Sequence, residues 1–259
     1  MPHNALLILK HWFHSYVQSF YSADEKLYFH VRLKEEHTLR VVEHGSEIGR
    51  WLALSPEQLK LAEIATLLHD IGRFKQYQTY GTFNDGLSVN HAELGLEILE
   101  ESTILTVAGL SAEQQILVKQ AVLYHNRRNL PDDIEADCSL LSKITRDADK
   151  LDIFSMLVTD NKENQIPQPP ELTCASNYSA HIIQELLEGY LITPKDIKTS
   201  ADLMLFRLSW IYDLNFSYSF SYLLQRQYIE KLIGKLPDTD EIQDVYRYIR
   251  KYAEEHAIA

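Results

Sequence analysis

The chain has few cysteines, few glycines and prolines, and no long apolar run. Two cysteines, Cys138 and Cys174, are too few for a disulfide framework and indicate a reducing compartment. Nine glycines and eight prolines in 259 residues argue against disorder. No run approaches the roughly 18 apolar residues of a membrane span, and the N-terminus lacks the basic region and cleavage site of a secretory signal. We therefore expect a soluble cytoplasmic protein with no membrane partner.

Positive charge is also scarce, because 25 basic residues stand against 37 acidic ones and leave a formal net charge of -12. Such a chain repels the phosphates of nucleic acid at long range, so we expect no nucleic-acid partner. A small anionic substrate is compatible with this charge, since bound metal ions and a few arginines reverse the local potential.

Helix-forming residues and capped amphipathic segments dominate the sequence, which predicts an all-α fold. Residues 1–160 are expected to form one helical domain, and residues 161–259 a helical extension packed on the same domain. Helices are predicted over 3–20, 35–52, 139–158, 178–190, 200–235 and 238–256, with others starting after Ser55, Asn90 and Ser111. The polar segment 75–88 is interpreted as a long loop that covers a site. The aromatic-rich C-terminal helices are compatible with a homodimer.

One His-Asp pair closes an apolar helical face. Leu61, Ile64, Ala65, Leu68 and His69 follow the i, i+3, i+4, i+7, i+8 spacing of one side of a helix, and Asp70 comes next. An ionisable residue on a buried face costs several kcal/mol unless it is hydrogen-bonded, paired or bound to a metal. A satisfied core histidine is the alternative interpretation for His69 alone.

Other polar residues interrupt apolar faces in the same way. His37 lies on the inner face of the helix 35–52, His91 begins the helix after Asn90, and His125 ends the helix after Ser111. Asp149 lies on the inner face of the helix 139–158, where a carboxylate requires a cation or several donors. The neighbouring Asp147 is expected to point elsewhere and to pair with a surface cation.

Six residues thus form a candidate ligand set: His37, His69, Asp70, His91, His125 and Asp149. Imidazole and carboxylate suit Fe, Mn, Zn or Co, and a carboxylate has two oxygens with which to bridge two ions. In a helical bundle such sites are built from side chains that project inward from several helices.

The order His…His-Asp…His…His…Asp resembles the HD-domain metal-dependent phosphohydrolase superfamily over about residues 30–160. The resemblance implies an HD-domain helical bundle in which His37, His69, Asp70 and Asp149 hold one metal. His91 and His125 match the bimetallic members, with Asp70 as the bridge. Two divalent ions are then expected, Fe or Mn before Zn, Co, Ni or Mg. The chain lacks the Gly-Tyr-Pro signature of the cyclic-dinucleotide phosphodiesterases of this superfamily, which disfavours that activity.

The predicted activity is hydrolysis of a small phosphorylated metabolite or nucleotide by a metal-activated water. Asp70 and Arg73 are the candidate catalytic residues. Phosphate oxygens require cationic donors, and arginine suits them best. The candidate substrate-binding residues are Arg73, Arg127, Arg128 and Lys150, each with a surface position as its alternative.

Two other functions fit the same residues. Mixed-valent di-iron oxygenases such as myo-inositol oxygenase resemble the same six-residue pattern, so the ligands alone do not separate hydrolysis from oxygen chemistry. A non-catalytic regulatory module that binds a metal or a nucleotide is the second alternative, although such a module has no need for all six residues.

Overall fold

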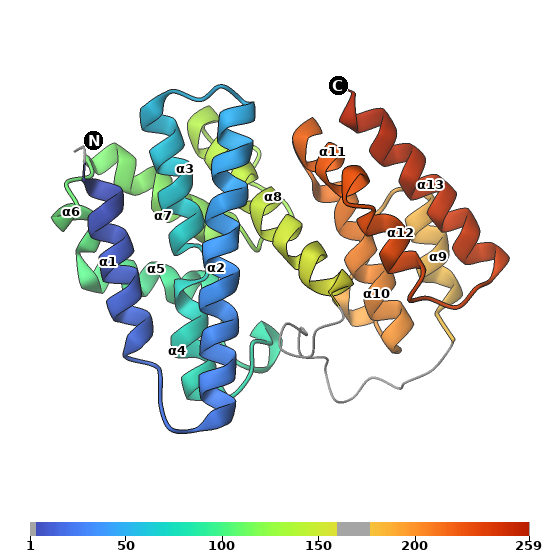
Figure 1. Cartoon of the computed structure of the whole chain (residues 1–259), viewed down its shortest axis with the longest axis horizontal. Helices are drawn as coiled ribbons and strands as arrows, with labels where there is room; N and C mark the ends of the chain where they lie inside the picture. The colour runs from blue at the N-terminus through green and yellow to red at the C-terminus, as the bar shows by residue number, and fades with distance from the viewer. Residues whose placement is uncertain (1–3, 160–176, 259) are drawn as a thin grey trace. The chain divides into compact units, whose positions relative to one another are not determined.

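The computed structural model describes residues 4–159 and 177–258, and these residues form helices with no β-strand among them (Figure 1). The predicted all-α class is confirmed. The chain divides into two compact units, Met1–Asp152 and Ile153–Ala259. The predicted boundary at residue 160 lies outside the described residues, so the predicted domain division stays a prediction. No helix in the described ranges is long and apolar enough to cross a membrane.

The first unit holds the helices that carry the candidate ligands (Figure 1). They are α1 (Ala5–Gln18), α2 (Glu25–Trp51), α3 (Pro56–Leu68), α4 (Ile71–Tyr80), η1 (Asp85–Leu87), α5 (His91–Ser102), α6 (Ile104–Val107), α7 (Ala112–Tyr124) and α8 (Ala136–Val158), whose last turns belong to the second unit. Helix α2 packs against α3 and α4, α4 against α5, and α7 against α3 and α5.

Side-chain caps set the starts of these helices. Ser55 and Gln58 form a capping box at the start of α3, and Ser111 and Gln114 form another at the start of α7, as the sequence predicts. Helix α2 begins ten residues before the predicted start, because the Asp24 side chain accepts a hydrogen bond from the backbone N–H of Leu27.

The predicted loop over 75–88 is wrong in its first half. Residues 75–80 continue α4, which ends where Gly81 takes the left-handed conformation at φ +67°. The connection to α5 is therefore short, and the 3-10 turn η1 occupies its middle. The polar residues of α4 hide its helical pattern, so the predicted loop begins too early in the chain.

Close packing between α4 and α5 depends on glycine. A Cβ atom added to Gly72 would lie 2.2 Å from the carbonyl oxygen of His91 and 2.8 Å from the backbone nitrogen of Gly95. Only a residue without a side chain allows this approach. Gly72 thus lets the start of α4, next to Asp70, meet the start of α5 at His91.

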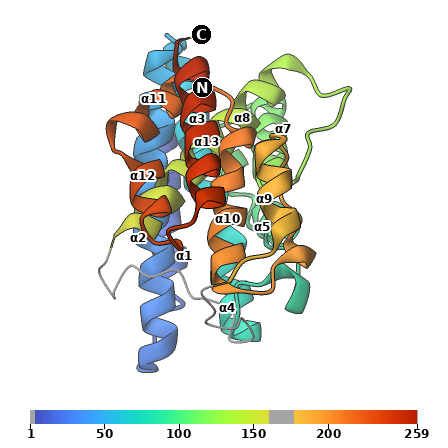
Figure 2. The ribbon, with the colours of Figure 1, turned by 90° about the vertical axis from the view of Figure 1, so that its right-hand side faces the viewer.

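The second unit is built from shorter helices: α9 (Ala180–Leu187), η3 (Pro194–Asp196), α10 (Ser200–Ser209), η4 (Trp210–Asp213), α11 (Ser217–Gln225), α12 (Tyr228–Ile233) and α13 (Asp240–Ala257). Helix α9 lies beside α10 and α13 (Figure 2), and α13 also packs against α11 and α12. The predicted single helix over 200–235 is wrong. It is broken by η4 and again at Gln227, whose φ is +55°.

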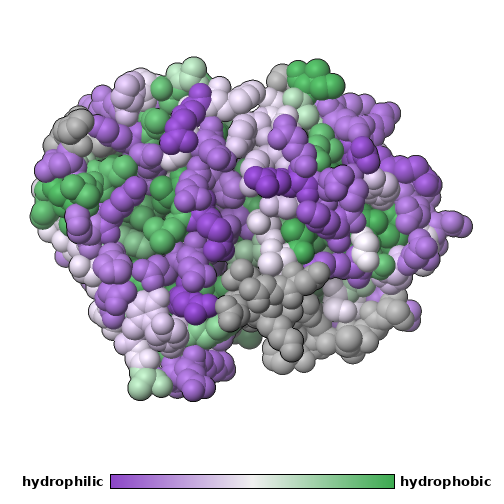
Figure 3. Space-filling model, viewed as in Figure 1, coloured by the Kyte–Doolittle hydropathy of each residue, from purple (hydrophilic) through white to green (hydrophobic). Residues whose placement is uncertain are grey.

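The surface carries many of the polar and charged residues that the composition contains. The face shown in Figure 3 is mostly hydrophilic, with apolar patches between the polar side chains. Cys138 is a buried free thiol, whereas Cys174 lies outside the described residues.

Candidate metal centre

Asp70 lies at the junction between α3 and α4, where the chain leaves one helix and starts the next. Its backbone angles, φ -103° and ψ 17°, are not helical, and the side chain is buried. His69 immediately before it is fully buried. The end of α3 thus places a carboxylate and an imidazole in the interior of the first unit.

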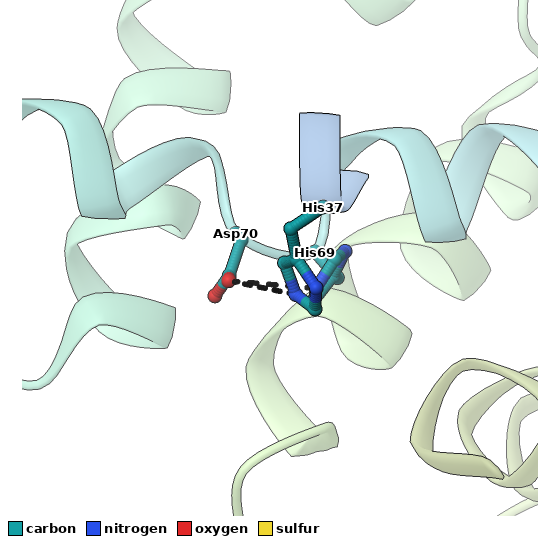
Figure 4. A group of neighbouring side chains, drawn as sticks. All are labelled: His37, His69 and Asp70. Atoms are coloured by element: carbon teal, nitrogen blue, oxygen red, sulfur yellow. Dashed lines mark ion pairs between the residues drawn. The ribbon is translucent and has the colours of Figure 1, made fainter. Parts of the chain in front are cut away.

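A first group of potential metal ligands surrounds the Oδ2 atom of Asp70. The Nε2 atoms of His37 and His69 each lie 3.6 Å from this oxygen, and both rings point toward it from different helices (Figure 4). Asp149 on α8 adds a second carboxylate, because its Oδ1 lies 3.1 Å from Nε2 of His37 and 3.7 Å from Nε2 of His69. His37, His69 and Asp70 together offer ligand atoms close enough to hold one ion.

A second group surrounds the other oxygen of the same carboxylate. The Nε2 atoms of His91 and His125 lie 3.3 Å and 3.6 Å from Oδ1 of Asp70. Asp70, His91 and His125 also fall within the distance that one ion requires. The structure therefore brings all six predicted residues together, and Asp70 belongs to both groups.

In each of the four imidazoles, the Nδ1 nitrogen lies within hydrogen-bond distance of an acceptor. The Nδ1 atoms of His37 and His91 lie 2.6 Å from carboxylate oxygens of Asp152 and Asp85. Nδ1 of His69 bonds the carbonyl of Thr66 at 2.7 Å, and Nδ1 of His125 bonds that of Val122 at 2.6 Å. A proton held on Nδ1 leaves the Nε2 lone pair to a metal.

The buried Nε2 atoms of His37 and His69 have no hydrogen-bond partner among the described residues. Buried polar atoms without partners are costly and rare, and they are found where a ligand completes the site. The donor set of four imidazoles and two carboxylates is the one that Fe, Mn, Co or Zn prefers. The residues present therefore fit divalent metal ions.

Charge pairing perturbs the ionisation of these groups. Burial would lower the pKa of His37, but the carboxylates of Asp149, Asp152 and Asp70 raise it to about 10. Burial and the nearby Arg73 lower the pKa of His91 to about 3, so this ring is neutral. Burial would raise the pKa of Asp70, yet Lys34 and the surrounding histidines hold it well below its usual range.

Three residues of the site escaped the sequence argument. Asp152 accepts from His37 and makes two further bonds with Arg40, and its position three residues after Asp149 on the same helical face was an available signal. Asp85 supports His91 from the connection before α5, where no periodicity marks it. Lys34 donates to Asp70 at 2.6 Å and was missed because α2 was expected to begin after it.

The predicted substrate-binding cations occupy different surroundings. Nη1 of Arg73 donates to Gln76, to the carbonyl of Phe83 and to Asp85, and its Nε lies 3.4 Å from Asp70. Arg127 is exposed beside the ring of Tyr124, and Arg128 is exposed; Lys150 is buried, with Nζ 3.5 Å from the carbonyl of Arg146. Arg73 thus lies beside Asp70, a candidate ligand, and the substrate-binding roles of all four residues stay predictions.

Helix α8 is buried on more sides than the sequence indicates. Asp147 is fully buried, so its predicted position facing a surface cation is wrong. The buried guanidinium of Arg146 donates to the carbonyls of Tyr124, His125 and Arg127. These bonds occupy carbonyls left without helical partners at the end of α7, and they fix the turn that carries His125.

Comparison with known proteins agrees with this geometry. The family model described as HD domain matches residues 35–153, a range that contains all six candidate ligands. No curated protein and no solved structure gave a match. Residues 35–153 are therefore an HD domain, and the His/Asp cluster within them fits a metal site.

Proposed function

We propose that this protein is a phosphohydrolase that binds two divalent metal ions and cleaves phosphate from a small phosphorylated metabolite or nucleotide. One observation carries the proposal. The two oxygens of Asp70 face separate pairs of imidazole Nε2 atoms, all within 3.3–3.6 Å. A carboxylate shared in this way is the expected bridge of a two-metal hydrolytic site.

The two ions would be held by different residues of the chain. His37, His69 and Asp149 would hold one ion with Oδ2 of Asp70, and His91 and His125 would hold the other with Oδ1. Asp152 and Asp85 keep the rings of His37 and His91 in orientation through their Nδ1 atoms. Bound ions would lower the pKa of water to near neutrality and neutralise charge on the phosphoryl oxygens.

The donor set favours Fe or Mn, with Zn and Co as further candidates, because imidazole ligands suit these metals better than Mg. The hydrolase assignment also draws on the family, whose members are generally hydrolases. No protein nucleophile is required, since an activated water is enough for attack on phosphorus.

The test is a phosphate-release screen on the purified protein loaded with Mn under anaerobic conditions, run beside an oxygen-uptake assay with Fe. Small phosphorylated metabolites and nucleotides form the substrate panel. Asp70→Asn should abolish release, because each ion loses a charged ligand. Asp133→Asn replaces an exposed aspartate and should leave release unchanged.

The outcomes separate the three functions. Release of phosphate without oxygen supports the hydrolase. Oxygen consumption that requires iron, with no phosphate release, would replace it with the oxygenase. Tight binding of a nucleotide without turnover in either assay would indicate the regulatory module.

A further inference from the structure

Lys34 is the cation closest to the shared carboxylate. It lies on α2 one helical turn before His37, and its Nζ is 2.6 Å from Oδ2 of Asp70. The lysine side chain is 18% exposed, whereas that of Asp70 is 4% exposed. A charged donor thus reaches from a solvent-accessible position to the edge of the candidate metal centre.

Other cations near the site donate several hydrogen bonds to protein acceptors. Arg40 makes two bonds to Asp152, and Nη1 of Arg73 has three acceptors in α4 and the connection to α5. Arg146 is occupied with the carbonyls at the end of α7. Each of these side chains is held in a fixed position by the protein.

Lys34 differs because Asp70 is its one polar partner among the described residues. An ammonium group has three N–H donors, so two remain for a ligand. The ring of Phe83 lies 5.6 Å from Nζ and flanks the ammonium without accepting a conventional hydrogen bond. A positive charge with donors left beside a metal ligand is suited to a phosphate oxygen.

We propose that Lys34 binds the phosphoryl group of the substrate directly. This inference rests on the proposed hydrolase function and adds a substrate-contacting residue that the sequence argument did not find. The Asp70 carboxylate holds the ammonium at the site, and the remaining N–H groups bind an anionic oxygen of the ligand. Lys34 is then a catalytic residue of the centre.

The experiment measures binding of inorganic phosphate to the Mn-loaded protein by calorimetry, with Mn binding measured separately. Lys34→Met removes the charge and keeps most of the side-chain volume. Lys34→Arg keeps the charge. Lys26→Met alters an exposed lysine on the same helix and is the matched control.

Phosphate should bind Lys34→Met about 10- to 100-fold more weakly than wild type, the cost of one lost charge-assisted hydrogen bond. Lys34→Arg should recover part of the affinity, and Lys26→Met should equal wild type. Mn should bind Lys34→Met as tightly as wild type or more tightly, because a neighbouring cation has been removed.

Three results would overturn the proposal. Phosphate affinity within twofold of wild type in Lys34→Met would leave Lys34 as a counter-ion of Asp70. Loss of Mn in Lys34→Met would make the lysine part of the framework of the site. Failure of Mn-loaded wild type to bind phosphate would overturn this inference, whereas the hydrolase itself stands or falls with the phosphate-release screen described above.

Discussion

The Nε2 atoms of His91 and His125 lie 3.0 Å apart. Both rings hold their Nδ1 proton against an acceptor, Asp85 for His91 and the carbonyl of Val122 for His125. In the neutral rings two Nε2 lone pairs therefore face each other at a distance that suits two ligands of one ion. The contact is unfavourable between two acceptors and becomes favourable when both bind the same cation.

Replacing His91 should accordingly remove one metal ion and keep the other. His91→Ala takes a ligand from the group around Oδ1 of Asp70 and leaves His37, His69 and Asp149 in place. Metal content of freshly purified protein, measured by mass spectrometry, should fall from two ions to one. His11→Ala, which changes an exposed histidine, should keep two. A single ion in both wild type and His91→Ala would make the centre mononuclear.

The two supporting aspartates should affect the two ions separately. Asp85→Asn weakens the acceptor behind His91, and Asp152→Asn weakens the one behind His37. Each change should reduce affinity about 10- to 100-fold for the ion nearer to it, as is usual for partners of metal-bound histidines. Titration with Mn should resolve a strong and a weakened step in each variant. Equal weakening of both steps would contradict this division.

Metal binding should release protons in a way that depends on His37. With a pKa of about 10, His37 carries an additional proton in the metal-free protein at pH 8, whereas an ordinary histidine does not. A metal must displace that proton, so apparent affinity should rise as pH increases from 7 toward 10. Calorimetry at pH 8 in two buffers of different ionisation enthalpy should count close to one released proton. A count of zero would mean that His37 is neutral before binding.

Substitution of Gly72 should destabilise the first unit. A Cβ atom there would lie 2.2 Å from the carbonyl oxygen of His91, so α4 and α5 must separate. Gly72→Ala is expected to cost about 1–3 kcal/mol, the range of overpacked cores. Chemical denaturation measures this loss of unfolding free energy. Gly86→Ala, whose Cβ would meet only the end of the Asn84 side chain, should stay near wild type.

The six candidate ligands were predictable because each interrupts an apolar helical face or lies at its end. Periodicity alone brought out His37, His69 and Asp149, and the structure places them together. Asp85 was not predictable in this way, since it lies in an irregular connection and its role depends on a ring six residues later. Lysine is usually a surface residue, and Lys34 gains a role at the site only because the fold places Asp70 next to it.

The helix breaks inside the second unit were not predictable from the sequence for a different reason. Gln227 takes a left-handed conformation that glycine adopts without strain, yet its side chain gives no sign of a break. The apolar pattern therefore continues through 200–235 while the backbone turns. Where glycine does mark a turn, as Gly81 does after α4, the end of a helix is visible in the sequence.

The fixed position of Asp70 also bears on ion size. Its two oxygens face imidazoles anchored through Nδ1 on α2, α5 and the ends of α3 and α7, and Gly72 keeps α4 against α5. The carboxylate has little room to shift toward one pair of rings without leaving the other. We expect ions with the radius of Mn or Fe to suit such a centre better than the larger Ca ion, which takes six to eight oxygen ligands. We therefore expect the packing of α4 on α5 to contribute to metal selection by radius, in addition to its role in stability.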